Sequence, residues 1–244
     1  MLKLIATELK KLRRKKMVWL MMLSSLFMPF MTFLLFRYRK DPVVDPMQFY
    51  RWSALGYTVV IIFPIVLGIF ATMLAHEEKS NDVMKQLWII PVKRSEYLAA
   101  KFGVLLLYSV AYMMITAGAT ILFAVCPGFV VFGWDHILFL LERCLEIGIL
   151  SALAILPILA AAVAGKGIVL PVCLTFVYAI AAFCVMPVNI YVLPLTNMMG
   201  IVLRGNRIPG INFIQSVNVP VAVLCMAVWS AAVLVFARAA LNKK

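Results

Sequence analysis

Residues 53–75 read SALGYTVVIIFPIVLGIFATMLA and carry no charged side chain. A bilayer core about 30 Å thick needs roughly 20 apolar residues of helix to cross it. Only helices and closed barrels satisfy their backbone hydrogen bonds at that depth. The whole sequence shares this character, because 65% of its 244 residues are hydrophobic and 14% are charged, whereas a soluble domain carries about 25% charged residues. The sequence therefore predicts an all-α, polytopic membrane protein.

Five further stretches are long and apolar enough to be candidate spans, although 137–163 also holds Glu142, Arg143 and Glu146. The six predicted transmembrane helices are 17–36, 53–75, 102–125, 137–163, 168–186 and 220–237. Prolines inside several of them, among them Pro29, Pro64 and Pro157, predict kinks, which membrane helices tolerate when neighbours satisfy the freed carbonyl groups.

Lysine and arginine indicate the orientation. If both termini lie in the cytoplasm, the cytoplasmic segments hold 16 of the 23 basic residues: seven in 1–16, five in 76–101, and Lys166, Arg238, Lys243 and Lys244. The positive-inside rule therefore predicts that both termini are cytoplasmic. The net charge of +13 is explained by topology and by attraction to anionic membrane lipid. No nucleic-acid partner is predicted, because no soluble domain is present to carry a basic face.

The N-terminal residues 1–16 form a predicted amphipathic helix. Leu2, Ile5, Leu9 and Leu12 recur at helical spacing, and Glu8 and the basic residues are expected elsewhere on the helix. Such a helix would lie in the inner headgroup layer and lead into the first span. An unstructured basic tail is the alternative. A signal peptide is not predicted, because the following apolar run is too long and lacks an A-x-A site.

The segment between the second and third spans, 76–101, is too polar for a membrane. Within it Val83, Met84, Leu87 and Trp88 form one apolar stripe of a helix. Ser95-Glu96 is typical of the start of the next helix, an N-cap followed by an acidic first turn. The segment therefore predicts a short amphipathic helix under the bilayer, available either to a cytoplasmic partner or to lipid alone.

Catalytic and metal-binding motifs are incomplete. His76-Glu77 begins a zinc-protease motif, but Ser80 stands where the second histidine is required. Glu77-Glu78 with His136 is only a fragment of the intramembrane CAAX-protease pattern. Gly165-Lys166-Gly167 is not a phosphate-binding loop, and the five cysteines lack metal or redox spacing. No catalytic residue, metal ligand or cofactor is predicted in this chain.

The paired Glu77-Glu78, the amphipathic stretch, and Pro91-Val92-x-Arg94-x-x-Tyr97-Leu98-x-x-Lys101 resemble the loop between the second and third spans of ABC-2-type transporter permeases. The basic N-terminal helix and the six spans resemble that family too. Asn81-Asp82 stands where many members have a Gly-Thr pair. The size of the chain and the Pro-Val-Lys-Arg-Ser turn resemble the lantibiotic-immunity branch, which is related to bacitracin-resistance permeases.

This resemblance implies a single permease domain over 1–244 that carries no ATPase domain. The segment 76–101 would hold a cytoplasmic coupling helix seated in a separate ATPase. The implied ATPase contacts are Glu77, Glu78, Asp82, Lys85, Gln86 and Arg94. Two cytoplasmic ATPase subunits are implied, with ATP and Mg²⁺ bound there, together with a second six-span permease, a different homologous chain more often than an identical copy. The implied location is the bacterial cell membrane.

Two features lie on the predicted outer side. The resemblance suggests that 187–219, which proline and glycine interrupt, forms extracellular or re-entrant half-helices; a packed lid is the alternative. Glu142, Arg143 and Glu146 lie near the outer end of the fourth span. They are interpreted either as an interfacial charge cluster, because long side chains reach water there, or as a substrate or gating site.

The expected function is that of an ABC exporter permease that expels a lantibiotic-type antimicrobial peptide for immunity or resistance. Export of a lipid, glycan, drug or ion is the alternative within transporters. A scaffold or sensor without transport is the alternative outside them.

Overall fold

The computed structural model describes residues 2–13, 15–39, 45–80, 94–130, 132–165, 167–204 and 217–242. Within these ranges the chain is helical and contains no strand, so the all-α prediction is confirmed for them. The elements in chain order are α1 (Leu2–Arg13), α2 (Lys16–Leu23), η1 (Ser24–Leu26), α3 (Phe27–Arg39), α4 (Pro46–Tyr50), η2 (Arg51–Leu55), η3 (Thr58–Ile62), α5 (Phe63–Ser80), α7 (Arg94–Val125), α8 (Trp134–Ala154), α9 (Leu156–Ala164), α10 (Val169–Val185), α11 (Pro194–Val202) and α12 (Val219–Asn242).

Five helical stretches in the described ranges are long and apolar enough to cross a membrane. They are Lys16–Tyr38, Pro46–His76, Glu96–Val125, Trp134–Ala164 and Val219–Ala239, and each encloses one predicted span. The remaining prediction, 168–186, corresponds to α10, an apolar helix of 17 residues. At 1.5 Å per residue that helix is roughly 26 Å long, shorter than a bilayer core of about 30 Å. The predicted count of six spans is therefore not confirmed.

Helix interruptions fall where prolines predict kinks. The 3₁₀ turn η1 stands between α2 and α3, ahead of Pro29. The π-helix η3 gives way to α5 just before Pro64, and α8 and α9 are separated at Ile155, ahead of Pro157. Proline lacks an N–H group and its ring clashes with the carbonyl four residues earlier, so the preceding turn leaves α geometry.

The first part of the second span is irregular. The π-helices η2 and η3 stand on either side of Gly56, where a Cβ atom would overlap the carbonyl oxygen of Arg51. The hydroxyl of Thr58 donates to the carbonyl oxygen of Ser53, and the Ser53 hydroxyl lies 2.7 Å from that of Thr120 on α7. Side-chain hydrogen bonds thus hold this part of the span where the regular helical ladder is interrupted.

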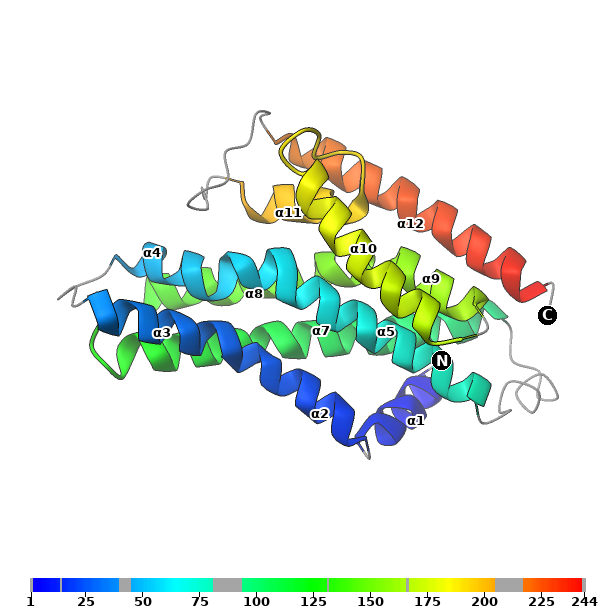
Figure 1. Ribbon diagram of the computed structural model, residues 1–244, viewed down its shortest axis with the longest axis horizontal. Coiled ribbons are helices and arrows are strands. Elements are labelled where there is room, and N and C mark those ends of the chain that lie inside the picture. Colours follow the sequence, from blue (N-terminus) through cyan, green and yellow to red (C-terminus); the bar gives the residue numbers. More distant parts are fainter. Residues whose placement is uncertain are drawn as a thin grey trace.

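The long helices α3, α5, α7 and α8 run alongside one another, and α10 to α12 lie over one side of them (Figure 1). The α7–α8 contact is close because Gly148 has no side chain: a Cβ there would lie 3.0 Å from the Cα atom of Val110. The Ser109 hydroxyl donates to the carbonyl oxygen of Gly148 across the same contact. Small residues that let helix backbones approach are the usual basis of packing in membranes.

Aromatic stacking joins α5 to α7. The rings of Phe70 and Tyr108 lie 3.7 Å apart and nearly parallel, and those of Phe63 and Tyr112 lie 5.0 Å apart. All four side chains are buried. These two ring pairs fix the packing of α5 on α7.

Candidate functional site

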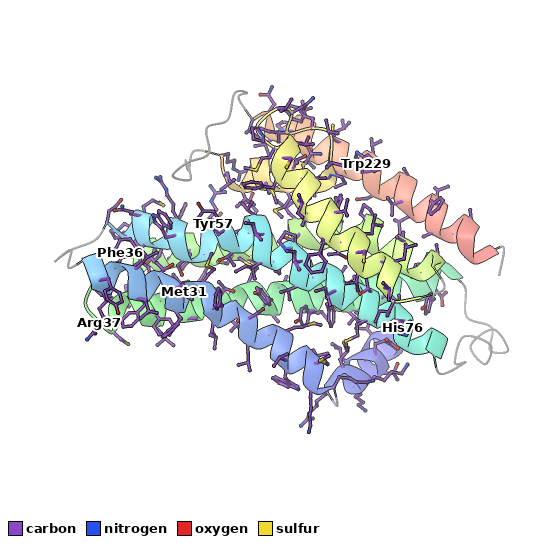
Figure 2. The ribbon with its side chains drawn as sticks, viewed as in Figure 1. Met31, Phe36, Arg37, Tyr57, His76 and Trp229 are labelled. Carbon is purple, nitrogen blue, oxygen red and sulfur yellow. The ribbon has the colours of Figure 1, made fainter. Side chains whose placement is uncertain are left out.

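The predicted coupling segment is described only at its two ends. Residues 81–93, and with them Asp82, Lys85 and Gln86, lie outside the described residues. Glu77 and Glu78 belong to the last turns of α5, and Arg94 is the first residue of α7. His76, near the end of α5, lies at the opposite end of the molecule from Arg37 of α3 (Figure 2). Both chain termini lie toward the His76 end (Figure 1).

A buried ionic contact ties together the helices on either side of that segment. The Lys101 ammonium of α7 donates to the Glu8 carboxylate of α1, with Nζ 2.8 Å from Oε2. The same Nζ lies 2.9 Å from the main-chain carbonyl oxygen of Leu74, in α5. We call Glu8, Lys101 and the Leu74 carbonyl the clasp. It joins α1, α5 and α7 at one point.

The clasp excludes water almost completely. Lys101 is 2% exposed and Glu8 is 8% exposed. A buried charge is tolerated only where a partner and further hydrogen bonds replace water, and the two acceptors around Lys101 supply these. The second oxygen of Glu8, Oε1, lies 2.8 Å from Nζ of Lys11. The ring of Tyr97 adds a cation–π contact, with its centre 5.5 Å from the Lys101 nitrogen.

The ionisation of Glu8 follows from these contacts. Burial alone would raise the pKa of the carboxyl group, but attraction to Lys101 and hydrogen bonds from Lys101 and Lys11 hold its pKa below the ordinary value. The carboxylate is therefore charged at neutral pH and forms charge-assisted hydrogen bonds to both ammonium groups.

The clasp corrects the predicted orientation of the N-terminal helix. Glu8 was expected away from the apolar face. Among residues 5–13 of α1, however, Glu8 and Leu12 are buried, whereas Leu9 is 41% exposed. Ile5, Glu8 and Leu12 share one face at spacings of three and four residues, and Ile5 lies beside Gly103 of α7. The prediction was wrong because the apolar residues of this helix were assumed to contact only lipid, whereas one face of the helix packs on α7. The sequence did contain a signal for this contact: Glu8 lies three residues after Ile5 and four residues before Leu12, so all three share one helix face.

A second ionic cluster joins α8 to the end of α11. Nη1 of Arg143 lies 2.6 Å from Oε2 of Glu146, and Nη2 of Arg204 lies 3.0 Å from Oε1 of the same carboxylate. Arg143 also lies over the ring of Phe139, with 5.4 Å between the guanidinium carbon and the ring centre. Glu142 is exposed and forms no ion pair with a described residue. The predicted trio is thus divided, and the sequence analysis missed Arg204.

The region predicted as half-helices contains α11, whose nine residues are all buried. It packs on α8, α10 and α12. The Asn197 side chain is fully buried, and neither its Oδ1 nor its Nδ2 has a partner among the described residues. Trp229 of α12 donates its indole N–H to the carbonyl oxygen of Val192, just before α11. This helix is therefore part of the packed interior.

Both ionic clusters hold helices together. Within the described ranges no group of three His, Cys, Asp or Glu side chains gathers to hold a metal ion. The clasp holds α1, α5 and α7 together at one point.

Residues 4–182 match the family described as ABC-2 family transporter protein. The matched range runs from α1 into α10 and includes the clasp and the segment 81–93. No curated protein matches the chain.

Proposed function

The chain belongs to the ABC-2 transporter family, and on this basis we propose that it is the permease subunit of an ATP-driven exporter. Its family and its apolar helices identify it as a multi-pass membrane protein and as the membrane component of an ABC transporter. Such a component works with an ATPase and is not itself a catalytic subunit. We propose that the ATPase is a separate protein bound by the segment 76–101.

The clasp is the observation that carries this proposal. The segment 81–93 connects α5 to α7, and Lys101 of α7 is hydrogen-bonded to the Leu74 carbonyl of α5 and to Glu8 of α1. A partner that pushes on the segment would therefore move the three helices as one body, because their ends are already joined. Without the clasp, the segment could move while its flanking helices stayed in place.

The rest of the chain offers a route for that displacement. The Phe70–Tyr108 and Phe63–Tyr112 stacks hold α5 and α7 together along their length. Ser109 and Gly148 then connect α7 to α8, and Glu146 connects α8 to Arg204 at the end of α11. Coupling across a protein of this kind travels through packed side chains and hydrogen bonds that move as units. We propose that a displacement of α5 moves α7, then α8, and finally α11.

The coupling contacts proposed on this chain all lie in residues 76–101. They are Glu77, Glu78, Asp82, Lys85, Gln86 and Arg94. These side chains bind the ATPase surface and perform no bond chemistry. ATP and Mg²⁺ are held by the partner. The proposed assembly contains two ATPase subunits and two permeases, the second being a homologous chain, with six spans in each permease and both termini in the cytoplasm.

The proposed substrate is a cationic, amphipathic peptide of the lantibiotic type, expelled from a bacterial membrane for immunity or resistance. The resemblance of the sequence Pro-Val-Lys-Arg-Ser at 91–95 supports this branch. The exposed carboxylate of Glu142, which forms no ion pair with a described residue, offers a contact for a positively charged peptide. Glu146 is shared by two arginines, so its proposed role is gating.

The test is a pull-down of the ATPase encoded beside this chain, co-expressed and extracted in mild detergent. The variant Glu77→Ala/Glu78→Ala/Arg94→Ala removes two acidic groups and one basic group beside the segment. The control Arg37→Ala/Asp45→Asn/Asp135→Ala removes the same charges from residues outside it. Membrane abundance and the size-exclusion profile establish that both variants insert and fold.

We expect wild type and the control to bind the ATPase and stimulate hydrolysis, and the first variant to lose both. Binding that survives the first variant would place the contact elsewhere. An ATPase that fails to bind even wild type would favour a scaffold without transport.

A further inference from the structure

A pocket of about 390 Å³ lies in the elbow between α1 and α2, against α7. Its lining is almost wholly apolar and includes Leu12, Val18, Met22 and Leu107. The volume falls within the range of about 300–1,000 Å³ that is usual for small-molecule sites. The elbow is the point where the polar N-terminal helix turns into the first apolar span, so the pocket lies at the depth where lipid headgroups meet acyl chains.

The rim of this pocket is cationic. Arg13 contributes to its lining and is exposed. Lys10 and Lys16, three residues to either side of Arg13 in the chain, are exposed as well. None of these three forms an ion pair with a described residue. Trp19, also at the rim, is 61% exposed, and its indole N–H donates to the carbonyl oxygen of Arg13 at 3.3 Å. Tryptophan is enriched at the boundary between headgroups and acyl chains.

An aromatic ring closes one wall of the pocket. Tyr108 of α7 lines the pocket and is 5% exposed. Its hydroxyl oxygen is buried among the helices and has no hydrogen-bond partner among the described residues, so that oxygen does not face the open pocket. Tyr108 therefore adds its ring to the apolar lining.

We propose that the elbow pocket binds an anionic phospholipid from the leaflet next to the chain termini. One acyl chain would occupy the apolar pocket, and the phosphate would lie at the rim beside Arg13, in the stretch of chain that also carries the exposed Lys10 and Lys16. A zwitterionic lipid offers the same acyl chain but no net charge for the rim. The combination of apolar pocket and cationic rim therefore selects the anionic class.

The site shares its helices with the clasp. Leu12 in the pocket and Glu8 in the clasp are one turn apart on α1, and Tyr108 and Lys101 both belong to α7. A lipid held between α1 and α7 stabilises the arrangement in which the clasp is closed. This inference goes beyond the proposed function, because lipid binding can be measured without any ATPase.

The test uses phosphatidylglycerol with a photoreactive group on an acyl chain, added to the full chain purified in mild detergent. Unlabelled phosphatidylglycerol and phosphatidylcholine with the same acyl chains serve as competitors. Labelled peptides are mapped by mass spectrometry. We expect labelling within residues 9–22 and 107–111 that phosphatidylglycerol displaces and phosphatidylcholine displaces poorly.

Three variants make the result specific. Arg13→Gln/Lys16→Gln should weaken the competition by phosphatidylglycerol about fivefold for each cation removed, since each is worth roughly 1 kcal/mol near an anionic lipid surface. Leu107→Trp should block the labelling by filling the pocket. The control is Arg238→Gln, which alters an arginine lining another apolar pocket of about 390 Å³, between α7 and α12, and it should leave the elbow labelling unchanged.

Several outcomes would overturn the proposal. Equal displacement by the two lipids would show that charge plays no part. Labelling confined to other helices would show that the elbow is not the site. If Arg238→Gln weakened the competition by phosphatidylglycerol as much as Arg13→Gln/Lys16→Gln does, the preference for this lipid would reflect the overall surface charge and not the elbow pocket. If Leu107→Trp fails to fold, the variant Arg13→Gln/Lys16→Gln still tests the proposal, because both of its positions are exposed.

Discussion

Lys101 is the residue on which the account depends most. It is an ammonium group with 2% exposure whose partners come from two other helices. Removing one member of a buried ion pair leaves the other uncompensated and costs about 3–5 kcal/mol. We expect Lys101→Ala and Glu8→Ala to lower the free energy of unfolding by this amount, measured by thermal or denaturant unfolding in detergent. Lys10→Ala, at an exposed position of α1, is the control and should stay within about 0.5 kcal/mol of wild type. Equal effects at Lys10 and Lys101 would contradict the buried contact.

The ionisation of Glu8 predicts a pH dependence with a definite sign. Because its folded pKa is held below the ordinary value of 4.5, the clasp contributes fully above that pH and loses its contribution as pH falls through the folded pKa. The difference between the thermal unfolding midpoints of wild type and Glu8→Gln should therefore stay constant above pH about 5 and shrink as pH falls below 4.5, since glutamine does not titrate. A difference that stays constant below pH 4.5 as well, while both proteins remain folded, would show that the carboxylate charge is not involved.

The same residue shows where sequence reasoning stops. Lys101 was read as a basic residue on the cytoplasmic side, and Glu8 as part of the polar face of α1. Their contact joins positions 93 residues apart, and no local periodicity reports such a distance. Arg204 was missed as a partner of Glu146 for the same reason. The ionic residues were visible in the sequence, but their pairing depends on tertiary packing.

The helices themselves were largely predictable, because length and apolarity decide what crosses a bilayer. The break before Pro157 was also predictable, since proline removes a helical hydrogen bond. The burial of α11 was not, because its sequence mixes Pro, Thr, Asn and Gly with apolar residues and matches neither a span nor an ordinary loop. The bounds of α10 were also close to the prediction, since 168–186 was expected and Val169–Val185 is observed.

The contact between α7 and α8 yields a prediction with an internal control. A Cβ at Gly148 would lie 3.0 Å from a backbone atom of Val110, whereas Gly118 of α7 has nothing within 4 Å of an added Cβ. Gly148→Ala should destabilise the chain by about 1–3 kcal/mol through overpacking. Gly118→Ala should be neutral or stabilise it by up to about 1 kcal/mol, because alanine restricts the unfolded chain. Unfolding in detergent measures both changes, and a similar effect at the two glycines would contradict the close packing of α7 on α8.

Across the whole molecule, the clasp lies at the end that contains both termini, and the Arg143–Glu146–Arg204 cluster joins α8 to α11 elsewhere. Glu142 is proposed to contact a cationic peptide, and Glu146 is proposed to act in gating through Arg204. If so, Glu142→Gln/Glu146→Gln should reduce peptide export severalfold at normal membrane abundance. Asp135→Asn, at an exposed position of the first turn of α8, should leave export unchanged. Export at the wild-type rate by the double variant would assign these glutamates to packing alone.

We propose that the clasp transmits the movement of an ATPase into the spans. The paired variant Glu8→Leu/Lys101→Met tests this role. Replacing both charges with apolar side chains of similar size leaves no uncompensated ion, so stability should stay close to wild type. The measurement is ATP hydrolysis and substrate export by the reconstituted complex, with bound ATPase quantified in the same sample. We expect the ATPase to bind normally while its hydrolysis no longer drives export. Export at the wild-type rate per ATP in this variant would contradict it.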